Sequence, residues 1–168
     1  MSNIAVIALG WCFLLTACDG PTAVEIRYNE ASGAYCGMFI SDPRYGAEVV
    51  SKTGKHYFFD SIECLVAFLI EGEDVSADQL HSAWVSDFAN PGTLIKAEEA
   101  YYFKSGQLRS PMAVNITAFA KRQDLEAAKS QFEGLQLVYT DLPNVVRESG
   151  LMQRVAGVHS NEHTSGNQ

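Results

Sequence analysis

The sequence has few basic residues and few cysteines, and each shortage excludes a class of protein. Among 168 residues, 12 Lys and Arg stand against 20 Asp and Glu, for a formal net charge of -8. No basic run exceeds two residues, so the chain would repel a phosphate backbone and we expect no nucleic acid partner. Four cysteines are too few for a disulfide scaffold. Hydrophobic residues make up 47% of the chain, which excludes a disordered protein and fits one ordinary core or two small subdomains.

The chain also lacks the common catalytic patterns. No Ser-His-Asp order, glycine-rich phosphate loop or pair of catalytic carboxylates stands out. We therefore expect a binding protein and not an enzyme.

The N-terminus begins with an apolar, uncharged run over residues 4–17, shorter than the roughly 20 residues that an apolar helix needs to cross a bilayer. A cleavable signal fits better, although residues 1–17 contain no Lys or Arg. The run ends in Leu-Thr-Ala before Cys18, which resembles the bacterial lipobox, so we expect cleavage before Cys18 and lipid on its sulfur and new amino group. Asp19 resembles the inner-membrane retention signal of enteric bacteria. We expect a lipid anchor on the periplasmic face of a bacterial membrane, with the inner membrane favoured and the outer membrane as the alternative.

Changes in composition divide the rest of the chain. A polar stretch after Cys18 indicates a tether, and the Ser-, Asn- and Gly-rich end indicates a disordered tail, in which His159 and His163 are interpreted as solvated side chains. The predicted segments are a signal peptide (1–17), lipid anchor and tether (18–35), a first unit (36–90), a second unit with a short helix (91–157) and the tail (158–168).

The two central units show the same order of predicted elements. The first has strands over 36–40, 47–50 and 56–59, a helix over 61–71 that is apolar nearly all round, and a strand over 83–88. The second has strands over 100–103 and 112–120, a helix over 123–132 and a strand over 135–139. Asp60 and Glu63 match a capping box for the first helix, and Gly134 suits the C-terminal cap of the second. We predict an α+β fold of two similar ββαβ subdomains that arose by internal duplication.

The tripeptide Cys36-Gly37-Met38 is the most informative motif. On a strand, alternate side chains point to one face, so the Cys36 thiolate and the Met38 thioether could converge on one ion. Thiolate and thioether are soft donors that select Cu(I) over hard ions such as Ca²⁺ or Mg²⁺. A structural zinc site is disfavoured because it needs four ligands, usually Cys or His. On residue type alone, a core methionine and a small buried cysteine remain the alternative.

Further motifs accompany this tripeptide. They are the lipobox at Cys18, Tyr57-Phe58-Phe59-Asp60 with Cys64 one helical turn on, Ala83-Trp84-Val85 followed by Asp87, Ala100-Tyr101-Tyr102, and Ser110-Pro111-Met112. Together these residues, which span about Cys18 to Ala120, resemble the NosL family of copper lipoproteins that accompany nitrous oxide reductase. The resemblance implies Cu(I) binding in the periplasm and delivery toward the copper-sulfide cluster of the reductase, by docking on the membrane-anchored NosDFY transporter. It also agrees with the duplicated ββαβ fold, which is distantly like that of organomercurial lyase.

The same resemblance implies a set of sulfur ligands. Cys36 is the best ligand and Met38 the second. Met112, which follows a proline, is a third sulfur contributed across the interface between the halves, with a core methionine as the equal alternative.

Asp60 and Cys64 are weaker candidates for the metal site. They are four residues apart and would share a face near the N-terminus of the first helix, where the helix dipole favours a thiolate. The neighbours of Cys64 are apolar except Glu63, which favours a buried structural cysteine, and Asp60 is first of all a helix cap. His56 and His81 are interpreted as surface or packing residues.

Two other function classes stay open. A disulfide between Cys36 and Cys64 would make the chain a structural or redox module, which an oxidising periplasm favours. An enzyme resembling organomercurial lyase would use two cysteines and an aspartate, and Cys36, Cys64 and Asp60 supply these residue types. The apolar setting of Cys64 and the lipoprotein signal argue against the enzyme.

Overall fold

The computed structural model describes residues 20–157. The expected signal peptide, Cys18, Asp19 and the tail with His159 and His163 lie outside the described residues. Within residues 20–157, no helix is both long enough and apolar enough to span a membrane.

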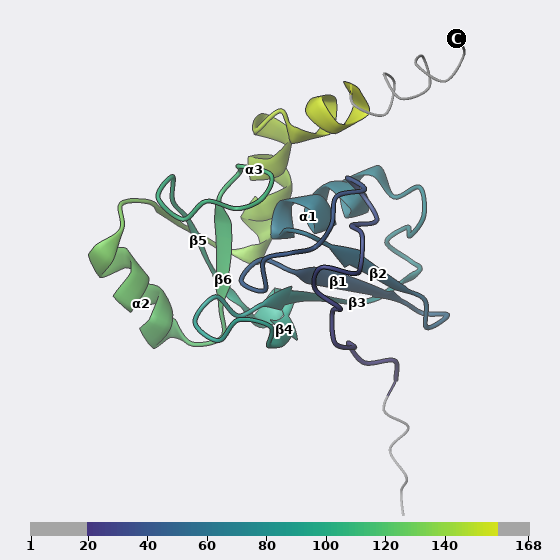
Figure 1. The fold of residues 1–168 in the computed structure, drawn as a ribbon, viewed down its shortest axis with the longest axis horizontal. Coiled ribbons are helices and arrows are strands. Elements are labelled where there is room, and N and C mark those ends of the chain that lie inside the picture. The colour runs from purple at the N-terminus through teal and green to yellow at the C-terminus, as the bar shows by residue number, and fades with distance from the viewer. Residues whose placement is uncertain (1–19, 158–168) are drawn as a thin grey trace, which may run out of the picture.

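Two antiparallel sheets form the framework (Figure 1), with strand orders β2-β1-β3-β4 and β6-β5-β7. The first sheet consists of β1 (Ala47–Ser51), β2 (His56–Phe59), β3 (Leu80–Ser86) and β4 (Leu94–Lys96). The second consists of β5 (Tyr101–Lys104), β6 (Ile116–Phe119) and β7 (Leu135–Leu137).

The helices cover these sheets at different places. They are α1 (Ile62–Glu71), α2 (Arg122–Gln131), α3 (Leu142–Glu148) and the single turns η1 (Ala97–Glu99) and η2 (Tyr139–Asp141), with residues 151–157 also helical. Helix α1 packs on β1 and β2 and against α3, whereas α2 packs on β5 and β6 (Figure 1). The second sheet is therefore covered by a different helix from the first.

The predicted α+β fold with two ββαβ units is confirmed. The first unit runs β1, β2, α1, β3 and the second runs β5, β6, α2, β7. In each unit the first strand is central and pairs antiparallel with the second and the third. The pairing pattern is thus the same in both halves, while their origin by duplication and the likeness to organomercurial lyase stay predictions.

The two units share one interior. The larger cluster of buried side chains joins Val49 and Leu65 of the first unit with Tyr102 and Ile116 of the second. Strand β4, which follows the expected boundary at residue 90, pairs with β3 and so belongs to the first sheet. We infer that the halves fold as one body around a common core, because neither sheet covers its buried face alone.

Helix α1 begins one residue later than the capping-box pattern indicates. Ser61 is the N-cap, and its hydroxyl accepts a hydrogen bond from the amide of Cys64 at 3.4 Å. Gly72 ends the helix in the left-handed conformation (φ 65°), which favours glycine. Because Ser61 caps the helix, the carboxylates of Asp60 and Glu63 are available for other contacts.

Part of the expected tether belongs to the packed domain. Ile26 is 3% exposed, and the amide of Val24 donates to the buried carboxylate of Glu48 on β1 at 3.0 Å. Glu48 also pairs with His56 on β2, so His56 is a packing residue, as expected. Within the expected tether, Val24 and Ile26 therefore already belong to the packed domain.

Candidate metal site

Cys36 lies in a tight hairpin loop and not on a strand. The amide of Asn29 donates to the carbonyl of Ile40 at 2.8 Å, and the amide of Gly33 donates to that of Met38 at 2.8 Å. Within the hairpin that these bonds close, Gly37 has a φ of 70°, a left-handed conformation that favours glycine. The expectation of a strand over residues 36–40 is wrong, because this turn interrupts the alternation that would place Cys36 and Met38 on one face.

The loop is fixed against the end of β2 and the end of α1. The amide of Ala34 donates to the carbonyl of Phe58 at 2.8 Å, and the hydroxyl of Tyr35 donates to the carboxylate of Glu71 at 2.7 Å. A Cβ added at Gly33 would lie 3.2 Å from the Sγ of Cys36 and 3.6 Å from the amide nitrogen of Asp60. The Cys36 thiol is thus folded inward, toward the junction of β2 and α1.

Three potential ligand atoms meet at this junction. The Sγ atoms of Cys36 and Cys64 and a carboxylate oxygen of Asp60 all lie within 4.8 Å of one another. Asp60 directly follows β2, and Cys64 lies in the first turn of α1, so the strand-to-helix connection holds two of the three groups. Asp60 is 2% exposed and Cys64 0%, whereas Cys36 is half-buried. An ion at this site would be reached from the side of Cys36.

The two cysteines are free thiols that interact with each other. A hydrogen bond from the Cys64 thiol lowers the pKa of Cys36, and the same bond together with burial raises the pKa of Cys64. Cys36 is therefore the better thiolate in the metal-free protein, and thiolate is the form that binds a metal.

Asp60 has an unsatisfied oxygen at the centre of the site. Its Oδ1 accepts a hydrogen bond from the hydroxyl of Ser61 at 3.4 Å, while its buried Oδ2 has no hydrogen-bond partner among residues 20–157. A buried carboxylate oxygen without a partner is unfavourable by about 1–3 kcal/mol or more, and few such atoms occur in native proteins. A cation bound between Asp60 and the two sulfur atoms would satisfy it, so the donor set fits a metal.

We expect Asp60→Asn to lower the pKa of the Cys36 thiol further. The negative charge of Asp60 raises the pKa of Cys36, so its removal favours the thiolate. The pH profile of Cys36 alkylation by iodoacetamide in the metal-free Cys64→Ala protein, with and without Asp60→Asn, measures this. A midpoint that stays in place or moves to higher pH would contradict the assigned proximity.

The structure places the two predicted methionines in loops. Met38 follows Gly37 in the hairpin and is 49% exposed. Met112 lies in a turn before β6, which begins at Ile116 and not at residue 112 as expected, and it packs against the edge of the same core cluster as Cys36. Copper ligation by Cys36, Met38 and Met112 stays a prediction.

The structure brings Cys64 and Asp60, the weaker candidates from the sequence, next to Cys36. Cys64 is buried, as expected, but burial and membership of the site are compatible because the thiol points at Cys36. Asp60 was interpreted as a cap, and Ser61 performs that role. The spacing of four residues between them was the signal for a shared face. His81, by contrast, contacts the hydroxyl of Ser82 at 3.1 Å and is exposed, as expected.

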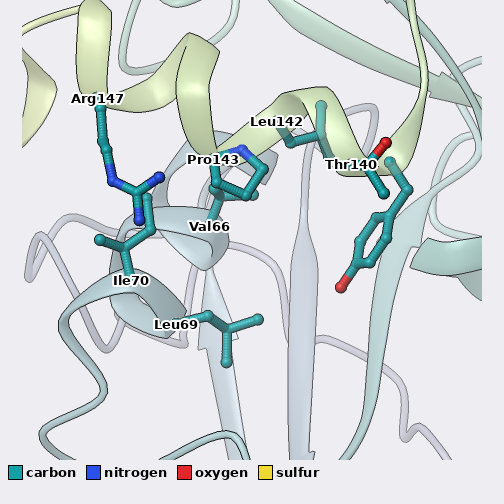
Figure 2. Close-up of a pocket in the computed structure, with 8 residues that line it drawn as sticks. Val66, Leu69, Ile70, Thr140, Leu142, Pro143 and Arg147 are labelled. Carbon is teal, nitrogen blue, oxygen red and sulfur yellow. The ribbon is translucent and has the colours of Figure 1, made fainter.

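A separate apolar groove of about 450 Å³ lies between α1 and the segment that leads into α3 (Figure 2). It is lined by Val66, Leu69, Ile70, Tyr139, Thr140, Leu142, Pro143 and Arg147. The lining contains no carboxylate, thiol or imidazole, so it is not a second metal site.

Comparison with known proteins agrees with this architecture. The model of the NosL family matches residues 24–146. The copper-binding lipoprotein NosL of Stutzerimonas stutzeri is 24% identical over 167 residues, which cover 92% of this chain and 87% of that protein. The crystal structure of the copper chaperone NosL from Shewanella denitrificans has a similar fold, with a TM-score of 0.64 and 24% identity over 73% of this chain and 96% of that chain. Since the family model matches well over half of its residues, the chain belongs to the NosL family.

Proposed function

We propose that this protein is a periplasmic lipoprotein that binds Cu(I) and delivers it for the maturation of nitrous oxide reductase. The single observation that carries the proposal is the buried cluster of Cys36, Asp60 and Cys64, whose ligand atoms lie within 4.8 Å of one another. The names of the relatives, a copper-binding lipoprotein and a copper chaperone, support it.

The chemistry of the cluster favours Cu(I) as cargo. Two sulfur atoms are a soft donor set, and Cu(I) prefers low coordination with soft ligands. Thioethers from Met38 and Met112 would complete such a site. Since Cys36 alone among the cluster is half-buried, release would proceed by exchange of a partner's ligand at Cys36.

The place of delivery is proposed from the lipobox motif, and the partner is proposed from membership of the NosL family. Lipid on Cys18 would anchor the protein to the periplasmic face of the membrane, and Asp19 favours the inner one. The acceptor would be a NosDFY-type ABC transporter that serves the reductase. With a charge of -8, the protein would suit a basic docking face.

Competition for Cu(I) tests the proposal. The purified, metal-free protein is titrated under anaerobic conditions against a chromophoric Cu(I) chelator. We expect the protein to withdraw Cu(I) from the chelator and Ca²⁺ or Mg²⁺ in excess to leave this unchanged. Failure to compete would refute the copper assignment, and release of hydrocarbon from an organomercurial by the same preparation would revive the lyase alternative.

Replacing Cys64 with alanine distinguishes a ligand from a core cysteine. We expect Cys64→Ala to lower the Cu(I) affinity by about 10- to 100-fold, because one of two thiols in the cluster is lost. Val66→Ala is the matched control, since Val66 is buried on the same helix but outside the cluster. It should reduce stability and leave the Cu(I) affinity unchanged. Equal affinities for wild type and Cys64→Ala would make Cys64 a structural residue.

A further inference from the structure

Glu63 is a buried carboxylate that the proposed copper site does not use. It lies between Ile62 and Cys64 in the first turn of α1 and is 0% exposed. Its Oε1 accepts hydrogen bonds from the hydroxyl of Ser110 and from the amide of Val114 at 3.3 Å, while Oε2 has no partner among the described residues. Burial of a carboxylate is unfavourable, so its contacts need an explanation.

Both partners of Glu63 belong to one loop, residues 110–115, which joins β5 to β6. The amide of Ser110 donates to the side chain of Asn115 at 3.1 Å, and the amide of Asn115 donates to the hydroxyl of Ser110 at 2.8 Å. These two bonds close the loop at its ends. Met112 lies between them.

The loop contains a residue in a conformation that it does not favour by itself. Ala113 has a φ of 63°, in the left-handed region that alanine rarely adopts, whereas Asn115, with a φ of 67°, is of a residue type that adopts this region more readily. External contacts must hold such a conformation. Glu63 supplies two of them, and Arg154 supplies another by donating to the carbonyl of Met112 at 3.4 Å.

We infer that Glu63 is a positioning residue that docks the 110–115 loop on the first turn of α1 and thereby holds the Met112 thioether beside the Cys36–Asp60–Cys64 cluster. Ser110 and Val114, which donate hydrogen bonds to Glu63, flank Met112 in the loop. Cys64, which follows Glu63 in the chain, belongs to the cluster, so Glu63 connects the loop with the cluster. The inference rests on the proposed function. It adds a residue of the second unit to a site built by the first, with a buried carboxylate as the connection.

A double-mutant cycle in the Cu(I) competition assay tests this link. We expect Met112→Leu to lower the Cu(I) affinity about 10-fold and Glu63→Ala to lower it nearly as much. If Glu63 acts through Met112, adding Glu63→Ala to Met112→Leu should lower the Cu(I) affinity by a further factor of about two at most. Glu63→Gln keeps the oxygen that accepts both hydrogen bonds and should retain most of the affinity. Ser110→Ala, which removes one of the two bonds, is a milder variant in case Glu63→Ala does not fold.

Hydrogen exchange of the metal-free protein gives a readout that is independent of copper. Glu63→Ala should speed exchange of the Val114 amide at least about tenfold, and Glu63→Gln should not. Thr117→Val is the matched control, since Thr117 lies on β6, outside the loop, and the substitution removes its buried hydrogen bond to the carbonyl of Phe103 on β5. Thr117→Val should reduce the free energy of unfolding and leave the Cu(I) affinity unchanged. Hydrogen exchange in the 110–115 loop should rise only as far as this loss of overall stability requires.

The outcomes separate the two proposals. Additive losses in the cycle, or a Val114 amide that exchanges at the wild-type rate in Glu63→Ala, would overturn the positioning role. An unchanged affinity in Met112→Leu, in a protein whose wild type binds Cu(I) tightly, would also overturn it and leave the copper function standing. A wild type that does not compete for Cu(I) would overturn the proposed function.

Discussion

Replacing Cys36 with alanine is expected to lower the Cu(I) affinity by at least about 100-fold, the largest functional effect that we predict. Loss of an outer partner of a metal ligand costs 10- to 100-fold in affinity, and Cys36 is itself the candidate ligand. It is the thiol with the lowered pKa and the only half-buried member of the cluster. The variant therefore loses the main soft donor and the group through which the ion would enter and leave.

The measurement is the anaerobic Cu(I) competition titration, repeated with Cys36→Ser to preserve the size of the side chain. Phe39→Ala is the control, because Phe39 lies in the same hairpin and is 66% exposed. It should bind Cu(I) like the wild type. If Cys36→Ala competes as well as the control, copper ligation by Cys36 is wrong and the cluster has another purpose.

Replacing Gly134 with alanine is expected to reduce the free energy of unfolding by at least about 2 kcal/mol, the largest effect that we predict for a methyl group added at any glycine of residues 20–157. A Cβ at Gly134 would lie 2.3 Å from the carbonyl oxygen of Lys104 and 2.6 Å from Cζ of Phe103. The first is backbone of β5 and the second is a ring that is 1% exposed, so neither moves freely. Strand β7, which starts at the next residue, would have to shift away from β5.

Urea denaturation of the metal-free protein measures this loss. Gly106→Ala is the matched control, since a Cβ there would meet nothing within 4 Å, and its effect should stay within about 0.5 kcal/mol. A Gly134→Ala protein as stable as the control would mean that β7 tolerates displacement. Copper affinity should survive in both variants as long as they are folded, because neither glycine lies in the cluster or in the 110–115 loop.

The sequence pattern also marks Gly134 as a special position, but the structure requires glycine there for a different reason. A glycine after a predicted helix favours a C-terminal cap, but α2 ends at Gln131 and its C-cap residue is Phe132, in an extended conformation. What excludes a side chain at Gly134 is the approach of β5, which lies some 30 residues earlier in the chain. No periodicity in the sequence carries that information.

The N-cap of α1 is a second feature that differs from the local prediction. Asp60 and Glu63 have the right spacing for reciprocal capping. The structure uses Ser61. The carboxylates of Asp60 and Glu63 instead face Cys36 and Ser110, and both of these residues come from distant loops.

The sequence by itself determined the order of elements in both ββαβ units, the buried character of α1 and the prominence of Cys36. These depend on hydrophobic periodicity, on turn residues and on residue type, which are local properties. Only the tertiary structure decided that Gly37 turns the chain, that Asp60 and Cys64 join Cys36, and that Glu63 holds the Met112 loop. The turn at Gly37 is held by hydrogen bonds within residues 29–40. The other two features depend on contacts between segments that are far apart in sequence, whose geometry is set by the packing of the shared core.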